Sequence, residues 1–299
     1  MTNNMIANLR LIANKNIDKQ KWDATVTAAK NGSPFAAAWC LDAVCGSRWD
    51  ALVLGDYEWV CPLPYHRKKL FFKSLYQPLL VQKYGVYSQN DLTDDILHLF
   101  YTFIIDSYKS VYLHWAMQPE GVNLAERQNQ ILPLQANYEA LHANFRRDHK
   151  TALKKVMRDF ELVDYDVKSY LQLHENTILE EFDANKKQYT LLHERLITAS
   201  LHQNIGHIIA IKSIVTQDIL GAVFYIKTKN RIYIVSCCTT ETGKKRRITR
   251  VLHEYLIQKY ANSAFTLDFC GSMIAGIAEY NKGFGATDEP YFVLQKKLF

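Results

Sequence analysis

The sequence lacks the features that mark membrane-spanning and secreted proteins. No apolar stretch among its 299 residues reaches the roughly 18 residues that a membrane span needs. The opening stretch MTNNMIANLRLIANKN has neither an apolar core of roughly 7–15 residues nor a small-residue cleavage site. We therefore expect neither a membrane span nor a signal peptide.

The sequence also lacks the spacings of metal sites and disulfide frameworks. None of its cysteines forms a C-x-x-C pair, and this absence predicts no metal and a reducing, cytoplasmic setting. Three histidines precede a glutamate, but none is followed by a second histidine four residues later, so the zinc-protease pattern fails. Motifs of the usual hydrolases, NTPases and dehydrogenases (G-x-S-x-G, the Walker loop, G-x-G-x-x-G) are absent. The cysteines are Cys40, Cys45, Cys61, Cys237, Cys238 and Cys270, and the histidines are His174, His193 and His253.

The composition is that of a globular protein. Hydrophobic residues make up 48% of the chain and charged residues 22%, which is ample material for a core. The length predicts about two domains, and the net charge of +6 permits anionic partners. Both halves show the same order of expected elements, namely helices, antiparallel strands, a helix and a strand. We therefore predict an α/β (α+β) fold with two domains, 1–137 and 138–299.

A basic loop stands before a helix of the second half. The stretch TTETGKKRRIT leads from a predicted strand, Arg231–Cys238, into a predicted helix, Ile248–Tyr260. Cations near a helix N-terminus each cost about 0.3–1 kcal/mol unless an anion is present. The stretch is either a solvated loop or a phosphate site, and the matching helix of the first half begins with acids instead. The residues of the candidate phosphate site are Gly243, Lys244, Lys245, Arg246, Arg247 and Thr249.

Two further stretches carry candidate substrate contacts. A long helix is predicted over Tyr138–Asp159, where basic residues four apart form one face that is either solvated or bound to an anion. The stretch LYQPLLVQKYGVYS (75–88) is rich in tyrosine and glutamine and could line a cleft for a polar substrate, although ordinary half-buried tyrosines are an equal alternative. The basic residues are Arg146, Lys150, Lys154 and Arg158, and the candidate substrate residues are Tyr76, Gln77, Gln82, Tyr84, Arg147 and Lys150.

The stretch LDFCGSMIAGIAEYNKGFGA (267–286) joins a predicted strand, Phe265–Phe269, to a short predicted helix, Ile274–Tyr280. Asp268 stands at the end of the strand, and Lys282 follows the helix, next to Gly283. Such a strand-to-helix turn, beside the basic loop, could form the floor of an acyl-transfer cleft.

Five stretches together resemble the FemABX-like branch of the GNAT (acyl-CoA N-acyltransferase) superfamily. They are WDALVLGDYEWVCPLP (49–64), LYQPLLVQKYGVYS (75–88), NFRRDHKTALKKV (144–156), GKKRRITRVLHEYLI (243–257) and LDFCGSMIAGIAEYNKGFGA (267–286). The resemblance implies two GNAT-like domains, each with a mostly antiparallel mixed sheet flanked by helices. It also implies that the pyrophosphate of an acyl-CoA donor lies at residues 243–249. The sequence departs from the family pattern at Arg247, where the loop has no second glycine, and at Asn281, where relatives have a lysine.

The resemblance implies transfer of an acyl or aminoacyl group to an amine. The leading hypothesis is an acyl-CoA-dependent N-acyltransferase acting on a small-molecule or peptide amine. Alternatives are an aminoacyl-tRNA-dependent transferase acting on a cell-wall precursor or peptide, and a non-catalytic binding module with the same fold. No DNA partner is expected.

The chemistry suggests a role for each candidate catalytic residue. Lys282 could stabilise the developing oxyanion, or it is a surface lysine in a turn. Tyr280 or Tyr291 could protonate the leaving group, although most of the 18 tyrosines must be structural. Asp268 could orient the amine or cap the following helix. A general base at Cys270 is not expected.

Overall fold

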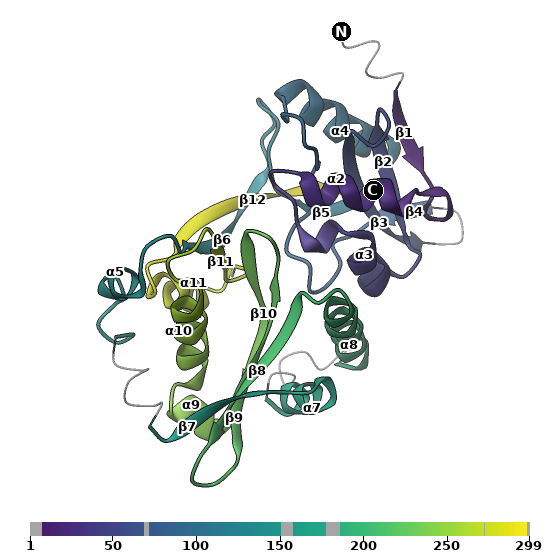
Figure 1. Ribbon diagram of the computed structural model, residues 1–299. Helices are drawn as coiled ribbons and strands as arrows, with labels where there is room; N and C mark the ends of the chain where they lie inside the picture. The colour runs from purple at the N-terminus through teal and green to yellow at the C-terminus, as the bar shows by residue number, and fades with distance from the viewer. Residues whose placement is uncertain (1–7, 69–71, 151–157, 178–185, 272, 298–299) are drawn as a thin grey trace. The chain divides into compact units, whose positions relative to one another are not determined.

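The computed structural model describes residues 8–68, 72–150, 158–177, 186–271 and 273–297 (Figure 1). The chain divides into two compact units: the first comprises Met1–Arg127 and Pro290–Phe299, and the second comprises Gln128–Glu289. Within the described ranges, no helix is both long and apolar enough to cross a membrane. The predicted mixed α/β fold with mostly antiparallel sheets and flanking helices is confirmed.

The first unit has a sheet with strand order β1-β2-β3-β4-β5-β12. All neighbouring pairs are antiparallel except β4 and β5, which are parallel. Helix α4 begins at Asp94 and is capped by Thr93, whose side-chain oxygen accepts the Ile96 N–H. The elements are β1 (Leu9–Ile12), η1 (Asn14–Asn16), α2 (Lys19–Ala28), η2 (Pro34–Ala36), α3 (Ala38–Cys45), β2 (Trp49–Leu54), β3 (Trp59–Lys68), β4 (Phe72–Leu75), α4 (Asp94–Ser107), β5 (Val111–Trp115) and β12 (Thr287–Lys296).

The second unit has the matching order β7-β8-β9-β10-β11-β6, again with one parallel pair, β10 and β11. Helix α10 lies on one side of this sheet and helices α7 and α8 lie on the other (Figure 1). The elements are β6 (Ala125–Pro133), α5 (Tyr138–Ala143), β7 (Phe160–Asp164), α7 (Val167–Thr177), α8 (Lys186–His202), β8 (Gly206–Ser213), β9 (Ile219–Lys227), β10 (Arg231–Thr239), α9 (Glu241–Lys245), α10 (Ile248–Tyr260), β11 (Thr266–Asp268) and α11 (Ala275–Lys282).

Each sheet is completed by a strand from the other half of the sequence. Strand β6 follows the elements of the first half but pairs with β11, through residues 131–133. Strand β12 ends the second half but pairs with β5, through residues 292–296. Because of this exchange, the compact units differ from the predicted ranges 1–137 and 138–299, most clearly at residues 290–299.

The predicted helix over Tyr138–Asp159 is wrong in its middle. Helix α5 ends at Ala143, and the described residues up to Lys150 form turns. After the helix the backbone bonds to a distant segment instead, because the Arg146 N–H donates to the Gly283 carbonyl at 2.8 Å. Arg146 and Lys150 therefore do not share a helix face, and Lys154 lies outside the described residues.

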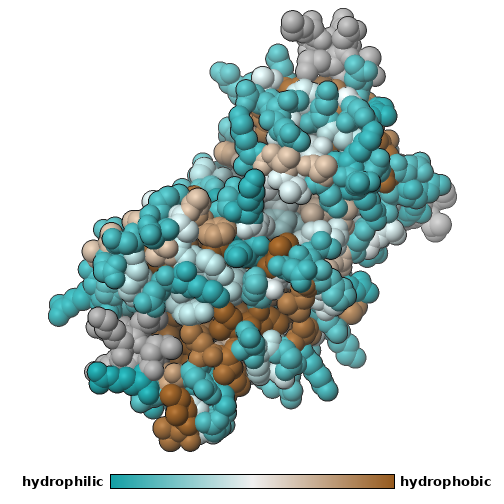
Figure 2. Space-filling model, in the orientation of Figure 1, coloured by the Kyte–Doolittle hydropathy of each residue, from teal (hydrophilic) through white to brown (hydrophobic). Residues whose placement is uncertain are grey.

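The core of the second unit lies mainly between its sheet and α10. Ile248, Val251, Leu252 and Leu256 of α10 are buried, as their helical spacing predicts. Polar residues cover much of the visible face in Figure 2, and an apolar area lies over the middle of the second unit, where Figure 1 draws strands β8 to β10. The packing of the buried α10 residues fixes this helix against the sheet and so fixes the loop before it.

Candidate active site

Strands β10 and β11 pair over three residues and then separate. Their register ends at Tyr233 and Asp268, although β10 continues to Thr239 on its other side, paired with β9. A bulge interrupts the β10–β9 register between Ile234 and Ser236. Beyond Tyr233, β10 has no strand partner on the side of β11 among the described residues.

The separation begins where β11 turns away. The Asp268 carboxylate accepts the backbone N–H of Cys270 at 2.7 Å, which closes a tight turn. Cys270 and Gly271 both have positive φ, 54° and 56°. Asp268 is fully buried, and its other oxygen lies 3.3 Å from Arg231. These contacts make Asp268 a residue that shapes the turn.

The basic loop contains a short helix that its sequence did not reveal. Thr240 caps α9 by accepting the Gly243 N–H at 3.0 Å. Gly243 is buried, and a Cβ there would lie 2.0 Å from the Leu220 carbonyl oxygen. Lys244 and Lys245 stand at the C-terminus of α9, where the helix dipole favours cations. The electrostatic cost expected for four cations at one helix N-terminus is therefore partly offset.

The remaining loop residues lead into α10. Helix α10 begins at Ile248 and ends at Tyr260, as predicted. Arg247 precedes it in the left-handed region, with φ of 59°, and gives no side-chain cap. The Arg246 guanidinium lies over the Phe160 ring at 5.7 Å, and Thr249 is half-buried in the first turn. Lys244, Lys245, Arg246 and Arg247 are all exposed.

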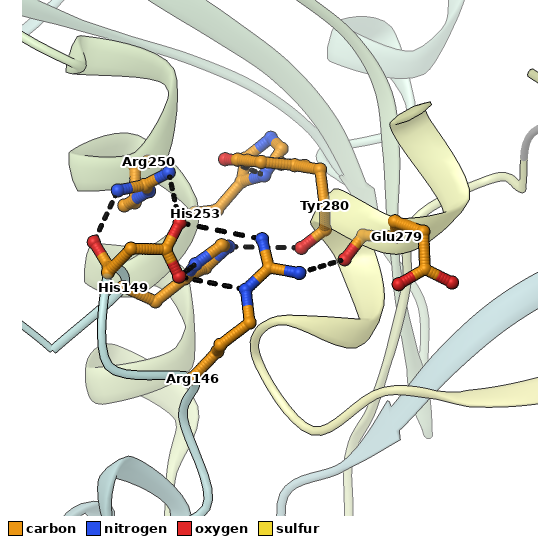
Figure 3. Close-up of polar contacts among 7 residues, drawn as sticks. Arg146, His149, Arg250, His253, Glu279 and Tyr280 are labelled. Atoms are coloured by element: carbon orange, nitrogen blue, oxygen red, sulfur yellow. Dashed lines mark hydrogen bonds and ion pairs between the residues drawn. The ribbon is translucent and has the colours of Figure 1, made fainter. Parts of the chain in front are cut away.

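A cluster of charged residues joins α10 to the turn after α5 (Figure 3). Arg146 Nε donates to the Asp148 carboxylate at 2.8 Å, and Arg250 lies 3.3 Å from the same group. Arg250 also donates to the Asp148 backbone carbonyl. The Arg146 contact is the first cause that holds the pKa of Asp148 well below its usual range. The cluster ties the predicted basic stretch to the first turn of α10.

His149 extends this cluster to α11. Its side chain is fully buried, its Nε2–H donates to the Tyr280 carbonyl at 3.0 Å, and its Nδ1 lies 3.1 Å from Asp148. Burial lowers the pKa of His149, and Asp148 opposes that shift. The ring lies on Gly283, where a Cβ would come within 2.4 Å of the ring carbon Cε1. Packing against a histidine thus explains this glycine of the YNKGFG stretch.

Two histidines contact Tyr280, one at its backbone carbonyl and one at its phenol oxygen. Its phenol oxygen lies 3.1 Å from His253 Nδ1, on α10. Burial raises the pKa of Tyr280 well above its usual value, Cys237 of β10 adds to the rise, and Arg250 opposes it. Cys237 lies one residue beyond the β10 bulge, so the phenol interacts electrostatically with the part of β10 beyond its pairing with β11.

Lys282 is ion-paired. Its Nζ lies 2.8 Å from the Asp288 carboxylate, and its side chain is 40% exposed. Asp288 also accepts a hydrogen bond from Gln130 at 3.2 Å. Asn281 is buried and donates to the Gln130 side-chain oxygen at 3.2 Å. This buried position explains why an amide, and not a second lysine, precedes Lys282.

The tyrosine-glutamine stretch belongs to the first unit and bonds largely within itself and to β5. Gln77 accepts the His114 N–H at 2.9 Å, and the Gln82 carbonyl lies 2.8 Å from His114 Nδ1. Tyr84 forms a parallel bridge with Trp115 and is 1% exposed. Tyr76 stacks on the neighbouring His66 ring at a centroid distance of 3.5 Å.

The other candidate residues divide between the units. Tyr291 lies in the first unit, where its ring packs 5.3 Å from that of His114. In the second unit, Arg147 is exposed, and Lys150 donates to the Ala143 carbonyl at the end of α5. Tyr280, Asp268 and Lys282 therefore belong to the same unit as the basic loop, whereas Tyr76, Gln77, Gln82 and Tyr84 belong to the first unit.

Sequence reasoning missed the buried histidines of the second unit. His149 lies within the stretch predicted as one long helix, and the sequence presents His253 only as part of a zinc motif that fails. A third group is His193 on α8, whose Nε2 lies 2.7 Å from Ser236 Oγ at the β10 bulge. The available signal is that His193 and His253 fall at buried positions of helices α8 and α10, and this position does not reveal their partners.

Comparison with known proteins identifies the fold. No family profile matches the chain, and no curated protein matches it. Among solved structures, FemX matches at 12% identity with a TM-score of 0.67, covering 94% of this chain and 96% of FemX. A tandem GNAT protein from the clavulanic acid biosynthesis pathway matches at 12% identity and a TM-score of 0.53, covering 97% of this chain and 99% of that one.

A third structure points the same way. The C-terminal domain of a putative lysylphosphatidylglycerol synthetase from Agrobacterium fabrum matches at 10% identity with a TM-score of 0.55, covering 94% of this chain and 92% of that one. At such identities the likeness concerns the fold alone. The chain thus has the fold of the FemABX-like branch of the GNAT superfamily.

Proposed function

We propose that the protein is an N-acyltransferase that moves an acyl group from acyl-CoA to a small-molecule or peptide amine. The observation that carries the proposal is the course of β10 after Tyr233. Its edge toward β11 runs past the bulge at Ser236 and ends at the basic loop before α10. An extended, amide-bearing arm such as that of CoA can bond to a strand edge as another strand would.

The phosphates of the carrier would lie at the N-terminus of α10. Helix N-termini attract anions through their unsatisfied N–H groups and their dipole. Lys245 and Arg247 are exposed there, next to Thr249 in the first turn. Gly243 belongs to the same loop but acts by permitting close packing on β9.

The first unit is a poorer donor site. Its parallel strands β4 and β5 also pair only briefly, at Leu75 and Val111. There, however, the chain itself fills the edge of β5, because Tyr84 donates to the His114 carbonyl and accepts from Ala116. We therefore assign the donor to the second unit, and we leave Tyr84 out of the proposed substrate contacts.

Tyr280 is our candidate for protonating the leaving thiolate. Its phenol interacts electrostatically with Cys237 of β10, and its hydroxyl is hydrogen-bonded to His253 and to no carboxylate among the described residues. Lys282 could reach a developing oxyanion only after exchanging its bond to Asp288. Asp268 supports the turn between β11 and α11, so we assign it a positioning role.

Aminoacyl-tRNA is the second candidate donor, and a feature of the loop favours it. The N–H groups of Gly243, Lys244 and Arg246 are already bonded to Thr240 and Thr242. The loop therefore offers phosphates mainly side-chain cations, which suits an extended polyanion as well as a pyrophosphate.

Thermal denaturation with CoA, acetyl-CoA, longer acyl-CoAs and charged tRNA tests the proposal. A ligand at 100 times its Kd stabilises by about 2.7 kcal/mol, which raises Tm by about 5–10 °C for a unit of this size. Replacing Lys245 and Arg247 by alanine should abolish most of this shift. The matched control replaces Lys168 and Lys229, exposed lysines of the same unit outside the loop, and should keep it.

The outcomes separate the donors. A shift with acyl-CoA, followed by release of free CoA thiol when an amine is added, supports the first candidate. RNA binding that weakens steeply with salt, without a CoA shift, supports the second. No shift with any of these ligands would overturn both and favour a non-catalytic module.

A further inference from the structure

His253 occupies an unusual position for a polar side chain. It is 6% exposed on the inner face of α10, and its ring lies among Phe269, Tyr280 and Phe284 at centroid distances of 5.7, 5.6 and 6.0 Å. Its Nδ1 faces the Tyr280 hydroxyl, whereas its Nε2 is buried and has no hydrogen-bond partner among the described residues. The Tyr280 hydroxyl is thus its one hydrogen-bond partner there.

The hydrogen-bonding capacity of a neutral ring decides how this pair is arranged. One ring nitrogen carries a proton and the other accepts. If the proton were on Nε2, a buried N–H would have no acceptor, which proteins rarely tolerate. If the proton is on Nδ1, that N–H donates to the Tyr280 oxygen, and Nε2 is left only with an unused lone pair. The second arrangement leaves the hydroxyl proton of Tyr280 free to point elsewhere.

Resting on the function proposed above, we propose that His253 is a positioning residue that keeps Tyr280 ready to act as the acid. Its Nδ1–H donates to the phenol oxygen, so the phenol proton is directed at the leaving group. When the carbonyl–sulfur bond breaks, its electron pair stays on sulfur, and the Tyr280 proton neutralises the thiolate. The amine loses one proton on becoming an amide, and that proton restores the phenol through solvent.

The environment suits a donor that stays neutral throughout. Burial lowers the pKa of His253 to about 3, so the ring carries no charge at neutral pH. A neutral imidazole donor stabilises a forming tyrosinate without itself becoming an acid that competes for the proton. His149 holds the same tyrosine by its backbone carbonyl, so Tyr280 is fixed at both ends (Figure 3).

Nitrogen NMR of the protein labelled with ¹⁵N-histidine tests the arrangement without any substrate. The signals of His253 are identified as those that disappear from the spectrum of the His253→Asn variant. We expect a protonated Nδ1 and a bare Nε2 in the wild type. A bare Nδ1 with a protonated Nε2 would overturn the proposal, because the Tyr280 proton would then be committed to the histidine.

Kinetics with the donor that passes the binding test provide the second measurement. His253→Leu should lower kcat about 10–100-fold with little change in KM, because the lost hydrogen bond strengthens as charge develops on the phenol. His253→Asn keeps an N–H donor near Nδ1 and should recover part of this loss.

The combination with Tyr280→Phe distinguishes this role from a structural one. In the Tyr280→Phe background, His253→Leu should have almost no further effect on kcat. An equal loss in both backgrounds, or no recovery with asparagine, would overturn the positioning role. If the NMR result is as expected but no donor turns over, the proposed function fails and the hydrogen-bond arrangement stands.

Discussion

Gly283→Ala should destabilise the second unit although the backbone at this position suits alanine. Gly283 has φ of −61° and ψ of −18°, which any residue adopts. An added Cβ, however, would lie 2.4, 2.5 and 2.9 Å from three atoms of the His149 ring. The ring cannot retreat easily, because it is buried and contacts Asp148 and the Tyr280 carbonyl.

The magnitude follows from three contributions. Overpacking costs about 1–3 kcal/mol, and a lost bond from His149 to Tyr280 adds about 1 kcal/mol. Replacing glycine by alanine near a helix end returns about 0.5–1 kcal/mol. We expect a net loss of about 1–3.5 kcal/mol, seen as a lower urea midpoint with an unchanged m value.

The control is Gly276→Ala on the same helix. Nothing lies within 4 Å of a Cβ at Gly276, so alanine there should be neutral or stabilise by up to about 1 kcal/mol. Combining Gly283→Ala with His149→Ala should cost less than the sum of the two single changes. Equal stability of the two glycine variants would refute the steric explanation of this glycine.

Three other outcomes are expected. Burial lowers the pKa values of His174, His193 and His253 from 6.5 to about 4, 3 and 3, so the unfolded chain binds protons before the folded chain does as pH falls. The stability contributed by these histidines is full above pH 6.5 and is reduced by about 2 kcal/mol per histidine at pH 5. Urea midpoints that stay level from pH 7 to pH 5 would contradict this expectation. Arg247→Gly should raise the free energy of unfolding by about 1 kcal/mol, because it relieves a left-handed φ of 59°, and should weaken phosphate-ligand binding in calorimetry; a loss of stability would show that the side chain contributes more than the strain. Lys282→Ala should lower kcat about 10²–10³-fold with little change in KM if Lys282 faces the oxyanion, and Lys282→Arg should not fully restore it. Turnover at the wild-type rate would leave Lys282 as an ion-paired surface lysine at the end of α11.

The sequence alone determined the elements whose signals are local. Helix α10 was predicted at both of its ends, because an apolar stripe of helical period runs from Ile248 to Tyr260. The predicted strand Arg231–Cys238 likewise matches β10, Arg231–Thr239, to within one residue. The order of these elements was enough to predict the α/β fold of two similar halves.

Contacts between distant residues decided the rest. The spacing of Phe145 and His149 is compatible with a helix, but α5 ends at Ala143 and the Arg146 N–H bonds to the distant Gly283 carbonyl. The alternation of residues in β6 and β12 indicates strands but carries no information about their partners, so the exchange between halves was not predictable. The candidate site likewise depends on tertiary packing: His253 and Tyr280 are 27 residues apart, and only the packing of α11 against α10 brings a buried imidazole to a phenol.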